Sequence, residues 1–98
     1  MDEEILQVFE RFARAVRDGD APAFAALCVE DAPPEQELFA RNSAKVQRHG
    51  WTLRPRRIDH TGQIAELTFE VVDPGGRVVD QGVLTLSHEP GGWRIRAL

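Results

Sequence analysis

The stretch QIAELTFEVVDPGGRVVDQGVLTLSHEPGGWRIRAL (residues 63–98) alternates apolar and polar side chains and is interrupted by two turns. Residues 63–73 keep this alternation throughout, residues 77–88 carry Val78, Leu84 and Leu86 on one side, and Trp93 begins a last alternating run. The interruptions are Asp73-Pro74-Gly75-Gly76 and Glu89-Pro90-Gly91-Gly92, whose proline and glycine content is typical of turns. The stretch therefore predicts three antiparallel strands joined as a meander.

The residues before this stretch have a helical period. Apolar residues at positions 5, 8, 9, 12 and 16 predict an amphipathic helix over residues 3–17, with Glu10 and Arg14 as an ion pair on its outer face. An alanine-rich helix at about 21–29 follows Gly19, and a third helix is predicted at about 34–48. Between these two helices lie Asp31, the expected cap of the third helix, and the Pro33-Pro34 pair. Residues 51–58 are strand-like, and Pro55 restricts them to an edge or bulged strand.

Three helices followed by a four-stranded antiparallel meander form an α+β fold, and 98 residues suffice for one domain, 1–98. Because a half-buried antiparallel sheet hides one side, we expect the helices to cover the apolar face of a curved sheet. The residues expected to face inward are Leu53, Ala65, Leu67, Phe69, Val71, Leu84, Leu86, Trp93 and Ile95. The other face is expected to carry Arg54, Arg56, Glu66, Glu70, Arg94 and Arg96.

Composition excludes several classes of protein. Apolar residues make up 42% and charged residues 29%, and the net charge of −4 comes entirely from the first half of the chain. An acidic chain with only one compact basic cluster, at residues 54–57, is not expected to bind nucleic acid. No run of about 18 apolar residues is present, and the acidic start is not a signal peptide, so we expect no membrane partner and a cytoplasmic location.

Metal, cofactor and nucleophile sites have no support in the sequence. His49, His60 and His88 are far apart and lack the spacing of metal ligands, and no loop of the phosphate-binding type is present. The single cysteine, Cys28, excludes an internal disulfide and is expected to be a small buried residue of the second helix. We therefore expect neither a metal nor a cofactor, and we assign no catalytic residue.

The chain resembles the nuclear transport factor 2-like superfamily, which has a cone-shaped, cystatin-like α+β fold. The resemblance rests on Asp18-Gly19-Asp20, Ala25-Ala26-Leu27, Glu30-Asp31-Ala32 and the C-terminal Gly92-Trp93-Arg94-Ile95, and it covers nearly the whole chain. The superfamily contains isomerases, cyclases, hydrolases and dehydratases as well as non-enzymatic binding and assembly domains, so the resemblance does not settle function. Its isomerases use a tyrosine oxyanion donor, whereas this chain has no tyrosine.

Four residues are candidates for ligand binding: Asn42, Trp51, Trp93 and Phe69. Asn42 falls among the apolar positions of the third helix, where a buried amide needs a partner, either a ligand inside the cone or the backbone at the helix–sheet margin. The two tryptophans either line a pocket or pack in the core, and Phe69 is expected on the inner face of the sheet.

The sequence favours a small binding or assembly module without catalytic activity. We expect it to act as a homodimer through the outer sheet face or to bind another protein, and a small apolar molecule is a further possible partner. The alternative is a small isomerase, cyclase or hydrolase with a pocket between helices and sheet, using Asn42, Asp31 or a histidine. A cone with converging titratable groups favours the enzyme, and a filled cone favours binding.

Overall fold

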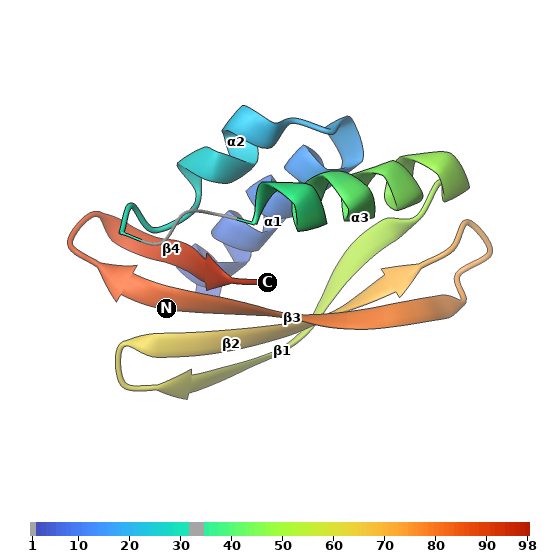
Figure 1. The fold of residues 1–98 in the computed structure, drawn as a ribbon. Helices are drawn as coiled ribbons and strands as arrows, with labels where there is room; N and C mark the ends of the chain where they lie inside the picture. Colours follow the sequence, from blue (N-terminus) through green and yellow to red (C-terminus); the bar gives the residue numbers. More distant parts are fainter. Residues whose placement is uncertain (1, 32–34) are drawn as a thin grey trace.

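The computed structural model describes residues 2–31 and 35–98. The elements are α1 (Asp2–Asp18), α2 (Ala21–Ala26), α3 (Gln36–His49), β1 (Thr52–Thr61), β2 (Ile64–Val72), β3 (Val78–Glu89) and β4 (Gly92–Ala97). The strands form one antiparallel sheet in the order β1-β2-β3-β4, and the three helices lie over one face of this bent sheet (Figure 1). The α+β fold expected from the sequence is confirmed.

The end of α1 and the start of α2 follow local chemistry, whereas the end of α2 does not. Gly19 adopts a left-handed backbone (φ 66°) after α1, and the Asp20 carboxylate accepts a hydrogen bond from the Ala23 amide as N-cap of α2. α2 ends at Ala26 instead of residue 29, because residues 27–29 hydrogen-bond to β4: the Val29 amide donates to the Ile95 carbonyl (2.9 Å) and the Ile95 amide to the Leu27 carbonyl (2.8 Å). Cys28 is therefore buried beside the edge of the sheet and is not helical.

The start of α3 differs from the expectation. Its N-cap residue is Glu35, which makes no side-chain capping bond, and Asp31 is an exposed residue 3.9 Å from the Arg96 guanidinium. The predicted cap at Asp31 is therefore wrong, because α3 begins five residues later, at Gln36. Pro33 and Pro34 lie outside the described residues.

The edge strand β1 contains the irregularity that Pro55 predicts. The pairing of β1 with β2 shifts register between Pro55 and Arg57, so that residue 56 has no direct partner on β2. The opposite edge strand, β4, is covered by residues 27–29, whereas β1 pairs only with β2 among the described strands. Among residues 2–31 and 35–98 the sheet therefore has one free edge, and that edge is interrupted by a proline and a bulge.

The core lies between α1, α2 and the inner face of the sheet. Its centre consists of apolar side chains with at most 2% exposure, namely Ile5, Phe9, Ala15, Phe24, Phe39, Ala65, Leu67, Leu84, Leu86 and Ile95. Aromatic rings connect the layers: Phe24 stacks on Phe39 (4.4 Å between centroids), and Phe69 of β2 lies 5.7 Å from Phe9 of α1. Burial at this density fixes α1 against the centre of the sheet.

α3 faces the core with a different polar residue from the one expected. Ser43 is 3% exposed, and its hydroxyl donates a hydrogen bond to the Val16 carbonyl of α1 (2.5 Å), while Asn42 is exposed. The expectation of a buried Asn42 is thus wrong, because α3 packs against α1 through the side of the helix that carries Ser43. On α1, the predicted ion pair between Glu10 and Arg14 is also absent from the ion pairs of the described residues.

Candidate functional site

The inner face of the sheet is filled at one end and hollow at the other. Along β2 and β3, the inner pairs Ala65–Leu86 and Leu67–Leu84 are completely buried. The next pairs toward the β2–β3 turn are Phe69–Gly82 and Val71–Asp80. Because glycine and aspartate replace leucine there, the apolar layer under α3 is incomplete.

A cavity of about 180 Å³ occupies the space between α3 and this end of the sheet. We call it the inner cavity. Its lining includes Phe12 and Val16 of α1; Leu38, Phe39, Asn42, Lys45 and Val46 of α3; Trp51 before β1 and Leu53 of β1; Phe69 and Val71 of β2; Asp80, Gln81, Gly82 and Val83 of β3; and Leu98. Most of these side chains are apolar, and the polar ones come from α3 and from the start of β3.

Gly82 determines the position of the Phe69 ring, which forms part of the cavity wall. An added Cβ at Gly82 would lie 2.5 Å from Phe69 Cζ, so the ring lies directly over the glycine. A glycine within a strand is typical of such a close approach. The ring also contacts Phe9 and Phe12 of α1, at centroid distances of 5.7 and 6.0 Å, which fixes its orientation.

The polar groups at the inner cavity are exposed and come from two opposite walls. Asn42 and Lys45 belong to α3, one helical turn apart, and Asp80 belongs to β3. Within residues 2–31 and 35–98, neither Lys45 nor Asp80 forms an ion pair, and one oxygen of Asp80 accepts from the Gln81 amide (2.8 Å). A ligand in the cavity therefore meets an apolar floor and a mouth that offers an amide, an ammonium and a carboxylate.

The structure brings three of the four candidate ligand residues together. Asn42, Trp51 and Phe69 line the inner cavity, and the half-buried Trp51 ring stacks on His49 at 4.5 Å. Trp93 lies at the other end of the sheet, with its ring 5.0 Å from His88 and 5.8 Å from His60. The candidate set remains a prediction, and Trp93 is not part of the same cavity.

The sequence reasoning missed Lys45 and Asp80, although two signals for them exist. Lys45 is three residues after Asn42 and therefore lies on the same side of the helix. Asp80 and Gly82 replace apolar residues at alternating positions of the third predicted strand. Asp80 and Gly82 therefore mark the end of the sheet whose inner face carries too little apolar side-chain volume to fill the space under the helices.

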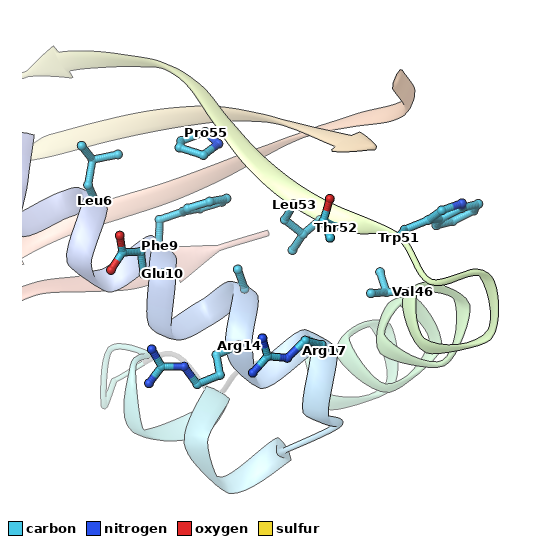
Figure 2. Close-up of a pocket in the computed structure, with 11 residues that line it drawn as sticks. Leu6, Phe9, Glu10, Arg14, Arg17, Val46, Trp51, Thr52, Leu53 and Pro55 are labelled. Carbon is cyan, nitrogen blue, oxygen red and sulfur yellow. The ribbon is translucent and has the colours of Figure 1, made fainter. Parts of the chain in front are cut away.

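A second hollow of about 440 Å³ runs between α1 and the free edge of the sheet at β1. We call it the outer groove. Figure 2 shows apolar side chains from α1 and β1, among them Leu6, Phe9, Leu53 and Pro55, with Arg14 and Arg17 below them in this view. Val46, Trp51 and Leu53 line both the groove and the inner cavity, so these three side chains form the partition between them.

The outer face of the sheet carries an ion-pair network over the hollow end. The Glu70 carboxylate, only 8% exposed, contacts Arg54 Nη2 (2.7 Å) and Arg56 Nη1 (2.6 Å). The hydrogen bond from Arg54 is the main cause that lowers the pKa of Glu70, and Arg56 adds to it, while burial acts in the opposite direction. Glu70 is therefore held in its ionised form by two arginines that are themselves more than half exposed.

The described residues contain a protonated cysteine thiol and no cluster of side chains of the metal-binding type. Burial raises the pKa of the Cys28 thiol to about 11, so the thiol is neutral near pH 7, and it donates to the Phe24 carbonyl (3.4 Å). The described part of the chain contains no group of three or more His, Cys, Asp or Glu residues placed to hold a metal ion. No helix in it is long and apolar enough to cross a membrane.

Comparison with known proteins identifies the fold and not the activity. No protein-family model and no curated protein sequence matches the chain. Among solved structures, an NTF2-like protein of unknown function from Methylobacillus flagellatus KT superimposes with a TM-score of 0.74 at 18% identity, covering 97% of this chain and 86% of that one. An NTF2-like protein of unknown function from Shewanella baltica OS155 gives 0.74 at 16% identity, covering 97% and 87%.

A structure from Agrobacterium tumefaciens C58 described as a "putative isomerase of the SnoaL-like family" also matches, with a TM-score of 0.66 at 16% identity and coverage of 97% and 93%. Identities this low carry no residue-level assignment, and the descriptions differ from one match to the next. The agreement in three dimensions extends over almost the entire chain. The chain has the nuclear transport factor 2-like fold.

Proposed function

We propose that this chain is a binding module whose inner cavity takes up a small, mainly apolar molecule. The observation that carries the proposal is the convergence of Asn42, Trp51 and Phe69 on one cavity with an apolar floor. Partly buried aromatic rings offer a ligand contact area at the cavity wall, and the Asn42 amide offers both a donor and an acceptor at its mouth.

The volume of the inner cavity limits the size of the ligand. An apolar cavity of about 150 Å³ is known to hold benzene, whereas drug-sized ligands occupy about 300–1,000 Å³. The inner cavity, at about 180 Å³, therefore fits a molecule with a single ring or a comparable branched aliphatic group. A polar substituent on such a molecule reaches the mouth, where Asn42 and Lys45 lie opposite Asp80.

Binding is favoured over catalysis by the placement of the ionisable groups. General acid–base chemistry needs a titratable group within hydrogen-bond reach of the reacting atom. Lys45 and Asp80 are exposed and belong to opposite walls, and the floor beneath them is built from Phe39, Phe69 and Val71. An isomerase or hydrolase would use groups aimed at the floor, where a single-ring substrate lies.

The test is a titration with benzyl alcohol, which carries one ring and one hydrogen-bonding group. We expect saturable shifts of the Asn42 and Phe69 amide signals and of the Trp51 indole N–H signal in NMR spectra, with a Kd of about 1 mM or below. Leu38→Trp fills the cavity from α3 and should weaken binding at least about tenfold. Ala40→Trp places the same ring on an exposed position of α3 outside the cavity and serves as the control. Equal binding by both variants, or no saturable shift, would contradict the proposal.

We further propose that the module forms a homodimer through the outer face of the sheet. That face carries both signs of charge: Arg54 and Arg56 keep free N–H donors, and Glu66 on the same face is exposed. A two-fold interface places each surface patch against its own copy, so a patch with both signs is self-complementary. Val83, which is 44% exposed and opposite Thr68, also lines the inner cavity, and its exposed part supplies apolar area to this patch.

Light scattering tests this assembly. We expect twice the monomer mass of 11.0 kDa at high micromolar concentration. Val83→Glu brings two like charges together across the proposed axis and should yield monomers, whereas Val83→Thr keeps the shape and should leave the dimer intact. A monomeric wild-type protein at that concentration would overturn the dimer and leave the inner-cavity proposal standing.

A further inference from the structure

The outer groove is not needed for the proposed inner-cavity function, and its surface is divided by polarity. Leu6, Ala13 and Trp51 are partly buried apolar side chains along the gap between α1 and β1. Arg14 and Arg17 lie at one border of the gap, as Figure 2 shows. A molecule that fills this groove therefore meets an apolar surface along its length and guanidinium groups along one side.

The geometry of the free edge disfavours the addition of a peptide strand beside the groove. An extended peptide needs successive free N–H and C=O groups along the edge of β1. Pro55 has no N–H, and the register shift between Pro55 and Arg57 displaces the backbone at the centre of that edge. The occupant must accordingly bind through side chains, and a volume of about 440 Å³ is within the range of small-molecule pockets.

The charges at the groove favour an anion. Arg14 forms no ion pair among the described residues, and Arg17 contacts only the exposed Asp18, at 3.2 Å. Glu10 also lines the groove, one turn before Arg14, and it repels an anion from the Leu6 end. The anionic group is therefore directed toward Arg14 and Arg17, with the apolar part lying between α1 and β1.

We propose that the outer groove binds an amphipathic organic anion, namely an alkyl chain of medium length with a carboxylate or phosphate head. The head is held by the guanidinium groups of Arg14 and Arg17, which match the oxygen geometry of both head groups. The alkyl chain covers Leu6, Leu53 and Pro55 and removes their exposed apolar surface from water.

Isothermal titration calorimetry with four probes of equal chain length tests this site: octanoate, octyl phosphate, octanol and octylammonium. We expect saturable binding of at least one anion, and binding of octanol and octylammonium about tenfold weaker or more. Dominance of octanoate or of octyl phosphate identifies the head group. Equal affinity for octanol and for both anions would overturn the proposal, as would the absence of binding by either anion.

Charge variants locate the head group on α1. The double variant Arg14→Gln/Arg17→Gln should weaken the binding of the preferred anion by about tenfold and leave the affinity for octanol unchanged. The loss is limited because each exposed pair of a guanidinium with the anionic head contributes modestly to the binding free energy. Arg11→Gln removes an exposed arginine of the same helix outside the groove and should change the affinity less than about twofold. If Arg11→Gln weakened anion binding as much as the double variant, only the overall charge of the protein would matter, and the proposed site would be refuted.

NMR mapping separates this site from the inner cavity. The anion should shift the amide signals of Leu6 and Ala13, which line only the groove, and should bind Leu38→Trp as tightly as the wild-type protein. Shifts confined to Leu38 and Asn42 would place the anion in the inner cavity and overturn the groove proposal. If the Leu6 signal shifted with protein concentration in the absence of any probe, a second copy of the chain would occupy the groove. This result would also overturn the groove proposal.

Discussion

At the end of the sheet that carries Leu67, Leu84 and Leu86, the inner side chains are completely buried, whereas at the end that carries Phe69, Gly82 and Asp80 they surround a cavity. Both ends belong to the same two strands, β2 and β3, and only the inner pairs change. The filled end lies under α1 and α2, and the hollow end lies under α3, whose buried polar residue bonds to α1 (Figure 1). The comparison shows that tight packing and open volume are separated along the same two strands.

Removal of a leucine at each end should give the largest contrast. Leu84→Ala, at a site with no exposed surface, should lower the free energy of unfolding by about 3 kcal/mol, because the surrounding core cannot close over the lost side chain. Leu53→Ala, at the half-buried partition between the two hollows, should cost about 1 kcal/mol. Urea unfolding at pH 7 measures both values. Equal losses would show that the hollow end is packed as tightly as the filled end.

Gly82→Ala should destabilise the protein by about 1–3 kcal/mol, because the new methyl group overlaps the Phe69 ring and forces it out of its position. The displaced ring has space only toward the inner cavity, so the variant should also bind benzyl alcohol less tightly. A double-mutant cycle with Phe69→Leu identifies the cause, since the penalty of Gly82→Ala should largely disappear when the ring is absent. An undiminished penalty would mean that the backbone of β3 requires the glycine.

Neighbouring residues of α3 should respond differently, because only one of them contacts α1. Ser43→Ala leaves the buried Val16 carbonyl without its side-chain partner and should cost about 1 kcal/mol. Asn42→Leu replaces an exposed side chain at the cavity mouth and should change stability by less than about 0.5 kcal/mol. Thermal and urea unfolding measure both, and a costly Asn42→Leu would place the amide in a structural role.

The smallest effect is expected on the outer face, from the ionisation of Glu70. Because the folded-state pKa of Glu70 is depressed, its stabilising contribution is present above the unfolded-state pKa of about 4.3 and is lost as the pH falls through the folded-state value. The difference in urea midpoint between the wild-type protein and Glu70→Gln should therefore exist at pH 7 and shrink in more acidic solution. Glu66→Gln, an exposed change on the same face, should show no such dependence. A difference for Glu70→Gln that stays constant down to pH 3 would contradict this account.

Much of the fold was predictable, because it depends on neighbours in sequence. Alternation and turn residues located the strands to within a few residues, and Pro55 correctly predicted an edge or bulged strand, since β1 is both. The end of α2 was not predictable, since residues 27–29 leave the helix to pair with β4, a partner nearly seventy residues away. The inward-facing polar residue of α3 was also missed: Phe39 and Val46 are buried as expected, but the helix buries Ser43 instead of Asn42, which lies about 100° away around the helix.

The candidate site was predictable in part. The sequence selected Asn42, Trp51 and Phe69, which line one cavity, but it also selected Trp93, which packs near His60 and His88 at the other end of the sheet. Both tryptophans lie beside turns in the sequence, so position along the chain does not distinguish them. Only the arrangement of the helices decides which of the two lies beside a cavity.

The sequence by itself determined which residues form helices and strands, where the turns fall and which face of the sheet is apolar, because these properties depend on backbone preference and on the period of two or 3.6 residues. The tertiary structure decided where the inner face is filled and where it is hollow, and which charged side chains border each hollow. That outcome depends on the fit between side-chain volumes from distant elements, such as Phe69 over Gly82 and Ser43 against Val16, which no local pattern encodes.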